Sequence, residues 1–171
     1  MNKLLLPKEY PSSPEELLEM MQKRFKYKQS IGYTTYDQII QNKEANCWGA
    51  ADFGMRVLDR LRIPSLIIFL SRGIAIDGEN TITPTTDART HAALIFKRDD
   101  EYFWFEWAWT KHEGINGPFS SSGKVIDKIY NAFAEEYGGP ITTRLHMSSI
   151  ADREVTVDEY LELAFQIDSL T

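Results

Sequence analysis

The sequence contains a single cysteine, Cys47, and this scarcity limits how the fold can be held together. One thiol cannot form a disulfide within the chain, so we expect the fold to depend on packing and hydrogen bonding. Structural disulfides form and persist mainly in oxidising compartments. The lack of an internal disulfide therefore favours a reducing environment, and we expect a cytoplasmic protein.

Long apolar runs are missing as well. A membrane-spanning helix needs about 20 consecutive apolar residues, whereas the longest apolar run here covers residues 66–70 and is typical of a buried strand. The leucine run at residues 4–6 is too short for the hydrophobic region of a signal peptide, and no small-residue cleavage pattern follows it. We therefore expect no membrane partner and no export by that route.

Positive charge is in deficit. The chain has 19 lysine and arginine residues against 25 aspartate and glutamate residues, a net charge of −6 and a pI near 5.1. Nucleic-acid binding draws most of its affinity from clustered basic side chains that neutralise phosphates. The one basic cluster, at residues 23–28, is interpreted as the solvated end of a helix. We expect no nucleic-acid partner.

What is present is an ordinary globular composition, with 43% hydrophobic and 26% charged residues. A chain of 171 residues can bury roughly 70% of its unfolded surface around one core, but it is short for two domains. No internal repeat or low-complexity segment is visible. We therefore predict a single domain over residues 1–171.

Apolar periodicity and turn signals predict both helices and strands. Helices are expected at residues 14–27, 47–61 and 124–137 and from about residue 156, with a short one at 36–40. Strands are expected at residues 65–71, 91–97 and 102–109, the last two joined as a hairpin by the turn at 98–101. Segments rich in glycine and polar residues predict loops at 72–90 and 114–123.

Cys47 is predicted to open the central helix, with Asn46 as its N-terminal cap. A thiol attacks only as its thiolate, which a helix N-terminus or a nearby histidine favours. Taken alone, a cysteine beside Ala50 and Ala51 can also be a small buried hydrophobic residue. A catalytic role therefore depends on whether a base and an acid lie close to the thiol.

His91 and Glu106 are the candidates for that base and acid. They lie eight residues before and seven after Asp99, in the turn of the predicted hairpin, so we expect them to be cross-strand neighbours. Strand alternation places Glu106 on one face with Trp104, away from Phe105. Alone, the histidine can be a strand-edge or core residue, and the carboxylate is either solvent-exposed or buried with a partner.

Four segments together resemble a known family. They are NCWGAA at residues 46–51, LRIPSLI at 61–67, THAALI at 90–95 and YFWFEW at 102–107. In order and spacing they resemble the transglutaminase-like branch of the papain-like cysteine protease superfamily. The spacings from cysteine to histidine (91 − 47 = 44) and from histidine to acid (106 − 91 = 15) look like those of the family, whose usual acid is aspartate. The resemblance covers residues 45–110.

The resemblance implies a fold and a set of catalytic roles. The fold would be papain-like, an α+β arrangement of helices packed on a small antiparallel sheet. Cys47 would be the nucleophile, His91 the base and Glu106 the residue that orients the histidine. The reaction would be acyl transfer on an amide through a thioester, with a protein or peptide as substrate and no cofactor or metal.

A tetrahedral intermediate also needs donors for its oxyanion. Helix geometry makes the backbone N–H of Cys47 one candidate. The resemblance to papain-like enzymes suggests the Gln41 amide as a second, with Gln38 and Asn46 as alternatives. Trp48 would form a wall of the cleft.

Three classes of function remain open at this point. Among enzymes, the acyl acceptor can be water in a peptidase or amidase, an amine in a transglutaminase, or water with a glutamine donor in a deamidase; we favour hydrolysis. The second class is an inactive papain-like domain used for protein binding. The third is a metal-dependent hydrolase built on His112, Glu113 and His146, whose spacing lacks a ligand pattern.

The acidic segment at residues 77–87 carries Asp77, Glu79 and Asp87. Such a segment can gate a cleft and favour basic substrates, but a long loop can equally be a plain connection.

Overall fold

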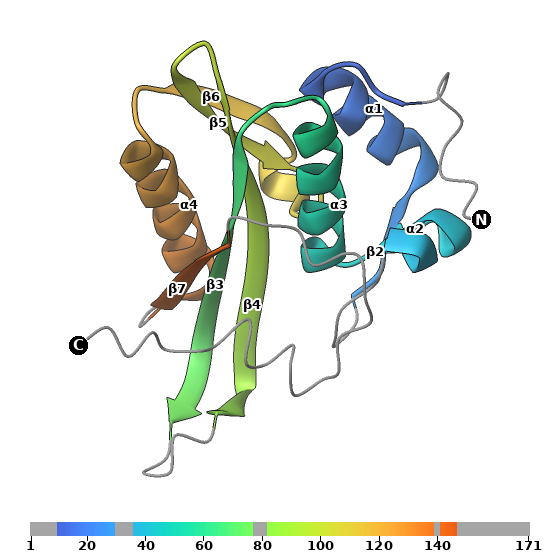
Figure 1. Ribbon diagram of the computed structural model, residues 1–171. Coiled ribbons are helices and arrows are strands. Elements are labelled where there is room, and N and C mark those ends of the chain that lie inside the picture. The colour runs from blue at the N-terminus through green and yellow to red at the C-terminus, as the bar shows by residue number, and fades with distance from the viewer. Residues whose placement is uncertain (1–9, 30–35, 77–81, 139–140, 147–171) are drawn as a thin grey trace.

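A computed structural model of the chain describes residues 10–29, 36–76, 82–138 and 141–146 (Figure 1). The fold is α+β, as the sequence predicted. Its centre is a five-stranded antiparallel sheet with the strand order β6-β5-β4-β3-β7. The strands are β3 (Ser65–Ile76), β4 (Ile82–Arg98), β5 (Glu101–Glu106), β6 (Gly114–Phe119) and β7 (Ile141–His146).

Four α-helices are present in the described part of the chain: α1 (Pro14–Arg24), α2 (Tyr36–Asn42), α3 (Cys47–Arg60) and α4 (Ser122–Tyr137). A short 3-10 helix spans Thr110–His112. Two short strands, β1 (Lys26–Tyr27) and β2 (Glu44–Ala45), pair in parallel outside the main sheet. Within the same residues, we find no helix with the length and apolar character needed to cross a membrane.

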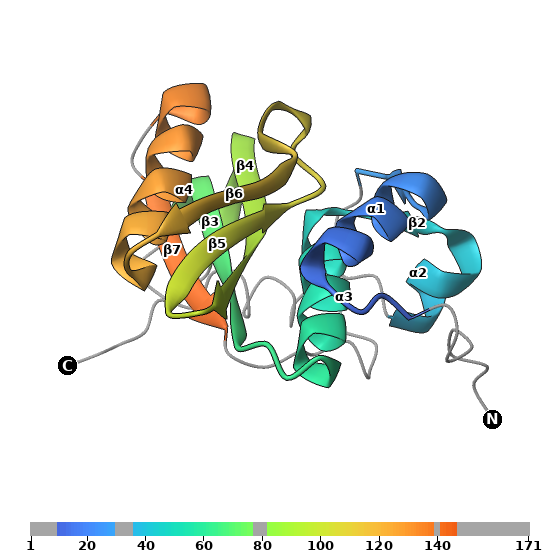
Figure 2. The ribbon, with the colours of Figure 1, turned by 90° about the horizontal axis from the view of Figure 1, so that it is seen from above.

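The helices lie on both faces of the sheet, with α1, α2 and α3 on one side and α4 on the other (Figure 2). Strand alternation divides the apolar side chains between two cores. Phe103, Phe105 and Trp107 pack in the core under α3, whereas Trp104 packs in the core under α4. The face predicted for each of these aromatic residues is confirmed.

A glycine in the middle of α3 allows the helix to pack close to the sheet. A methyl group added at Gly54 would lie 2.6 Å from Leu94 Cδ2 on β4, closer than atoms in van der Waals contact. The helix is therefore seated against β4 at a position that has no side chain. This close packing holds the middle of α3 against β4.

Two predicted loops were wrong, because they contribute strands. Residues 72–76 continue β3 and residues 82–90 belong to β4, with Arg72 opposite Arg89 and Ile74 opposite Pro84 around a register shift. The segment 114–123 contains β6, which pairs with β5, for example Ile115 with Phe105. In both segments, pairing with a neighbouring strand overrides a composition rich in glycine and polar residues.

The boundaries of other elements also differ from the prediction. The strand predicted at 102–109 ends at Glu106. The helix predicted at 14–27 ends at Arg24, because the backbone becomes extended at Phe25. The strands β1, β2 and β7 were not predicted. The helix expected from about residue 156 lies outside the described residues.

Candidate active site

Cys47 is the first residue of α3, and the local sequence explains why the helix starts there. The Asn46 side chain accepts a hydrogen bond from the Gly49 backbone N–H at 2.8 Å, which caps the helix as predicted. Asn46 itself is 3% exposed, so the cap is fixed by its surroundings. Cys47 is a free, half-buried thiol at the positive end of the helix dipole.

His91 lies on β4 opposite Leu70 of β3, and its side chain is buried. Its Nε2 atom lies 2.8 Å from Glu106 Oε2 on β5. The ring also packs edge-on against Trp109, with 5.1 Å between the ring centroids. The imidazole is therefore held in one orientation by a carboxylate on one edge and an indole beside it.

The register between these two strands differs by two residues from the prediction, which made His91 and Glu106 cross-strand neighbours. Leu94 pairs with Phe105, so Ala93 stands opposite Glu106, and His91 is the diagonal neighbour of the carboxylate. Cross-strand diagonals are about 7–8 Å long, which long side chains can span.

Glu106 is 2% exposed and completely satisfied by donors. Oε2 accepts from His91 and from Trp104 Nε1 at 3.1 Å, while Oε1 accepts from the backbone N–H groups of Ala108 and Trp109 at 2.8 and 2.9 Å. The sequence left two alternatives for this carboxylate, exposure to solvent or burial with a partner, and the structure shows the second. Four donors thus surround a buried carboxylate, which has no oxygen left without a hydrogen-bond partner.

This environment sets the charge on His91. Burial alone would lower the pKa of its imidazole, but the Glu106 carboxylate and the hydrogen bond with the Cys47 side chain raise the pKa to about 10. Because Nε2 is engaged by Glu106, Nδ1 is the ring nitrogen left for the thiol. The arrangement therefore favours an imidazolium placed between Cys47 and a buried carboxylate.

A shallow pocket lies beside the thiol, where about 190 Å³ of space not filled by atoms includes open solvent. Its walls come from the start of α3, from β4 and from the end of β5, and they are mostly small and apolar. The lining residues are Cys47, Ala50, Ala51, Ala92, Leu94, Phe105, Glu106, Trp107 and Ala108.

Two residues proposed for the cleft are not among those that line this pocket. Trp48 is 1% exposed and packs edge-on against Phe69, with ring centroids 4.7 Å apart, so it belongs to the core beneath α3. Gln41 is an exposed residue of α2. Its alternative Gln38 lies half-buried on the same helix, and Asn46 caps α3.

Sequence reasoning missed two aromatic residues at the site, Trp107 and Tyr27. Trp107 lines the pocket, and its place directly after Glu106 was a usable signal. Tyr27 lies with its ring centroid 6.5 Å from that of Trp107. No sequence pattern pointed to Tyr27, because only the two-residue strand pair β1–β2 brings it there.

His112 and Glu113, two of the residues considered for a metal site, make other contacts. His112 packs against the rings of Trp104 and Trp109, with centroids 5.1 and 4.4 Å away, and Glu113 accepts a hydrogen bond from Gln22. Within the described part of the chain, no three His, Cys, Asp or Glu side chains gather in a metal-binding group.

Two further predictions fall on residues that the structure does not describe in full. The side chain of His146 lies outside the described part of the chain. So do residues 77–81 and the other side chains of the acidic segment 77–87.

Comparison with models of known protein families gave no match, and neither did comparison with curated protein sequences. The functional argument therefore depends on the geometry of the site itself.

Proposed function

We propose that this protein is a papain-like cysteine enzyme of the transglutaminase-like type, which transfers an acyl group from an amide through a thioester on Cys47. The observation that carries the proposal is the placement of the His91 imidazole between the Cys47 side chain and the fully satisfied, buried carboxylate of Glu106. This is the geometry by which a base activates a nucleophile while a third group orients the base.

In the proposed reaction the Cys47 thiolate attacks the carbonyl carbon of the amide, forming a C–S bond and an oxyanion. The backbone N–H of Cys47 at the start of α3 is a donor for that oxyanion. The C–N bond then breaks, and His91 gives its Nδ1 proton to the leaving nitrogen. Glu106 keeps the ring in place and balances its positive charge throughout.

The thioester is resolved when His91 takes a proton from water and the resulting hydroxide adds to the carbonyl. The C–S bond breaks, an acid is released, and the thiolate and imidazolium are restored. We favour water as the acceptor, which makes the enzyme a hydrolase acting on a protein or peptide.

The first test is the pH dependence of iodoacetamide alkylation at Cys47. In the parent protein we expect the rate to reach its plateau well below pH 8.5, near which an ordinary thiol ionises, and we expect His91→Ala to abolish that plateau. Ser121→Ala is the control, because Ser121 caps α4 on the face of the sheet opposite α3. It should leave the plateau unchanged.

Slow alkylation that follows an ordinary thiol in both the parent and His91→Ala would contradict the enzyme proposal. The domain would then be a papain-like scaffold for protein binding. If the plateau is present, release of ammonia or a shortened peptide from glutamine-containing peptides, with and without an added primary amine, separates deamidation, hydrolysis and transamidation.

A further inference from the structure

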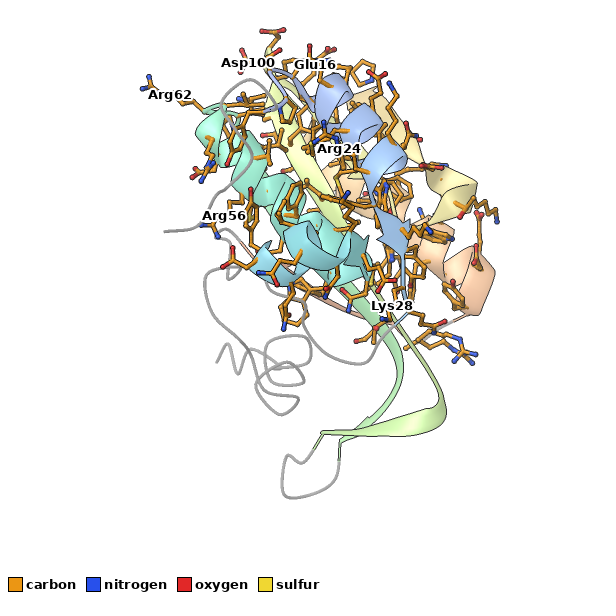
Figure 3. The ribbon with its side chains drawn as sticks, turned by 90° about the vertical axis from the view of Figure 1, so that its right-hand side faces the viewer. Glu16, Arg24, Lys28, Arg56, Arg62 and Asp100 are labelled. Atoms are coloured by element: carbon orange, nitrogen blue, oxygen red, sulfur yellow. The ribbon has the colours of Figure 1, made fainter. Side chains whose placement is uncertain are left out.

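Tyr27 is brought to the mouth of the site by the small parallel strand pair. It stands opposite Ala45 in the pairing of β1 with β2, and the backbone N–H of Lys28 donates to the Ala45 carbonyl at 2.9 Å. Lys28, labelled in Figure 3, follows the end of β1. Because Ala45 lies two residues before Cys47, the pairing fixes Tyr27 next to the start of α3.

The Tyr27 ring is open to solvent although it lies beside an apolar pocket. The side chain is 49% exposed, and Tyr130 on α4 is the other large hydrophobic residue of the described chain with comparable exposure, at 37%. The ring centroid of Tyr27 is 6.5 Å from that of Trp107, which lines the pocket with Cys47. The Tyr27 ring, which lies near the proposed nucleophile, is therefore partly exposed to solvent.

The charges around the Tyr27 ring limit which substrate groups can pack on it. Partial burial raises the pKa of the Tyr27 phenol, and the negative charges of Cys47 and Glu106 raise it further. The phenol therefore stays neutral at physiological pH, close to two groups that carry negative charge in the active form of the site. An acidic substrate group would be repelled here, whereas a neutral aromatic or aliphatic group would lose nothing by burial.

We propose that Tyr27 determines substrate specificity: an aromatic or bulky apolar side chain of the substrate packs on its exposed ring, beside Trp107, while Cys47 attacks the neighbouring carbonyl. This inference rests on the proposed function, since it assigns a substrate class to the same site. The ring makes the contact, and the hydroxyl is not required for it.

Two covalent probes with the same reactive group test this inference on the full chain. N-acetylphenylalanine chloromethyl ketone carries an aromatic side chain next to the attacked group, and N-acetylglycine chloromethyl ketone carries none. Both react with the thiolate, so the ratio of their second-order inactivation rates cancels differences in the nucleophilicity of Cys47. We expect the parent protein to favour the phenylalanine probe at least about tenfold, the range that burial of one aromatic group supports.

Tyr27→Ala and Tyr27→Gln should each reduce that ratio about tenfold, and Tyr27→Phe should keep it. Tyr27→Gln retains a side chain of similar length on β1, so the two variants together guard against a local loss of folding. Tyr130→Ala is the matched control, because it removes the other exposed tyrosine of the described residues, on α4 at the opposite face of the sheet. It should leave the ratio unchanged.

Three results would overturn the inference: an unchanged ratio in Tyr27→Ala and Tyr27→Gln, an equal loss in Tyr130→Ala, or a loss in Tyr27→Phe as large as in Tyr27→Ala. The pH profile of iodoacetamide alkylation is measured on the same samples. It reports on the thiolate independently of the ratio, so failure of the proposed function and failure of the substrate class are separate outcomes.

Discussion

The Nε2 atom of His91 lies 2.8 Å from Oε2 of Glu106, although the two residues are diagonal neighbours in the sheet. Ala93 is the residue opposite Glu106, so the histidine ring and the carboxylate must reach toward each other across the strands. The length of glutamate allows this reach and also leaves Oε1 for the backbone N–H groups of Ala108 and Trp109, where the chain bends after β5. One side chain thus orients the histidine and fixes the end of the strand.

Glu106→Gln should be damaging to both stability and reactivity. The amide keeps the shape of the side chain, but its NH₂ group would face donors from either His91 and Trp104 or the two backbone N–H groups. We expect the free energy of unfolding to fall by about 2–4 kcal/mol. We also expect the rate of Cys47 alkylation near pH 6.5 to fall at least about tenfold.

Glu136→Gln is the matched control for this change. Glu136 also accepts a hydrogen bond from an indole, Trp109 Nε1 at 3.1 Å, but it lies near the surface beside Lys111. The same substitution should cost less than about 1 kcal/mol there and leave alkylation unchanged. Urea unfolding and alkylation kinetics measure both, and equal effects at the two positions would contradict the role given to Glu106.

The raised pKa of His91 predicts how stability depends on pH. The native protein holds the imidazole proton up to about pH 10, whereas the unfolded chain releases it near pH 6.5. Between these values the native state binds more protons, so stability is fully present below about pH 6.5 and is lost as the pH rises toward 10. One proton corresponds to a slope of at most about 1.4 kcal/mol per pH unit.

The clean measurement uses a Cys47→Ala background, so that ionisation of the thiol does not contribute. In this background Glu106 still raises the pKa of His91 but Cys47 no longer does. We therefore expect the free energy of unfolding in urea to decline as the pH rises above 7 in Cys47→Ala, over a range that ends at a lower pH than in the parent protein, and to decline less in Cys47→Ala/His91→Gln. This pH range lies above the range in which His112 titrates, because burial lowers the pKa of His112. It lies below the range in which Tyr137 titrates, because burial and Glu136 raise the pKa of Tyr137 to about 12. Parallel slopes in the two variants would refute the assignment.

Much of the site could be predicted because its parts depend on local patterns. The cap at Asn46 and the two faces of β5 follow from residue type and strand alternation. The two-residue error in register arose because the hairpin turns between Asp99 and Asp100, both with positive φ, one residue later than a pairing of His91 with Glu106 requires. A turn that is centred one residue later shifts every pairing along the hairpin by two residues, which leaves each side chain on its predicted face.

Other features depended on contacts that no local pattern records. Tyr27 reaches the site only through its pairing with Ala45, which is 18 residues away in the sequence (45 − 27 = 18). The extensions of β3 and β4 beyond residues 71 and 91 were not predicted, because Pro84 and the surrounding polar residues are typical of loops. In the structure, Pro84 is paired with Ile74. Gln41 came from the resemblance alone, and its exposed position on α2 follows from tertiary packing.

The cap of α3 should affect the thiol as well as the helix. Asn46→Ala removes the acceptor for the Gly49 N–H, and we expect a loss of about 1–2 kcal/mol in the free energy of unfolding. It also frees the first turn of the helix, which carries Cys47. We therefore expect the alkylation rate of Cys47 near pH 6.5 to fall several-fold.

Ser121→Ala separates these two effects. Ser121 caps α4 in the same way, by accepting from the Lys124 N–H at 3.3 Å, but α4 lies on the opposite face of the sheet (Figure 2). This variant should lose about 0.5–1 kcal/mol with no change in alkylation. If both cap variants slow alkylation in proportion to their loss of stability, the cap of α3 has no specific effect on the thiol.

Gly54 should tolerate no side chain while Leu94 is present. The added Cβ would lie 2.6 Å from Leu94 Cδ2, and both residues are buried between α3 and β4. Alanine is favoured over glycine in a helix by about 1 kcal/mol, but overpacking a close-packed core costs about 1–3 kcal/mol. We expect Gly54→Ala to destabilise the protein in urea unfolding.

Two variants test the cause. Gly123→Ala makes the same exchange in α4, where the nearest atom to the new methyl group is Ser121 Oγ at 3.9 Å, so it should be neutral or stabilising. Leu94→Ala opens the space that Gly54→Ala would need, so the double variant should be more stable than the sum of the single losses predicts. Simple additivity would mean that Leu94 is not what excludes a side chain at Gly54, and that the close approach of α3 to β4 has another origin.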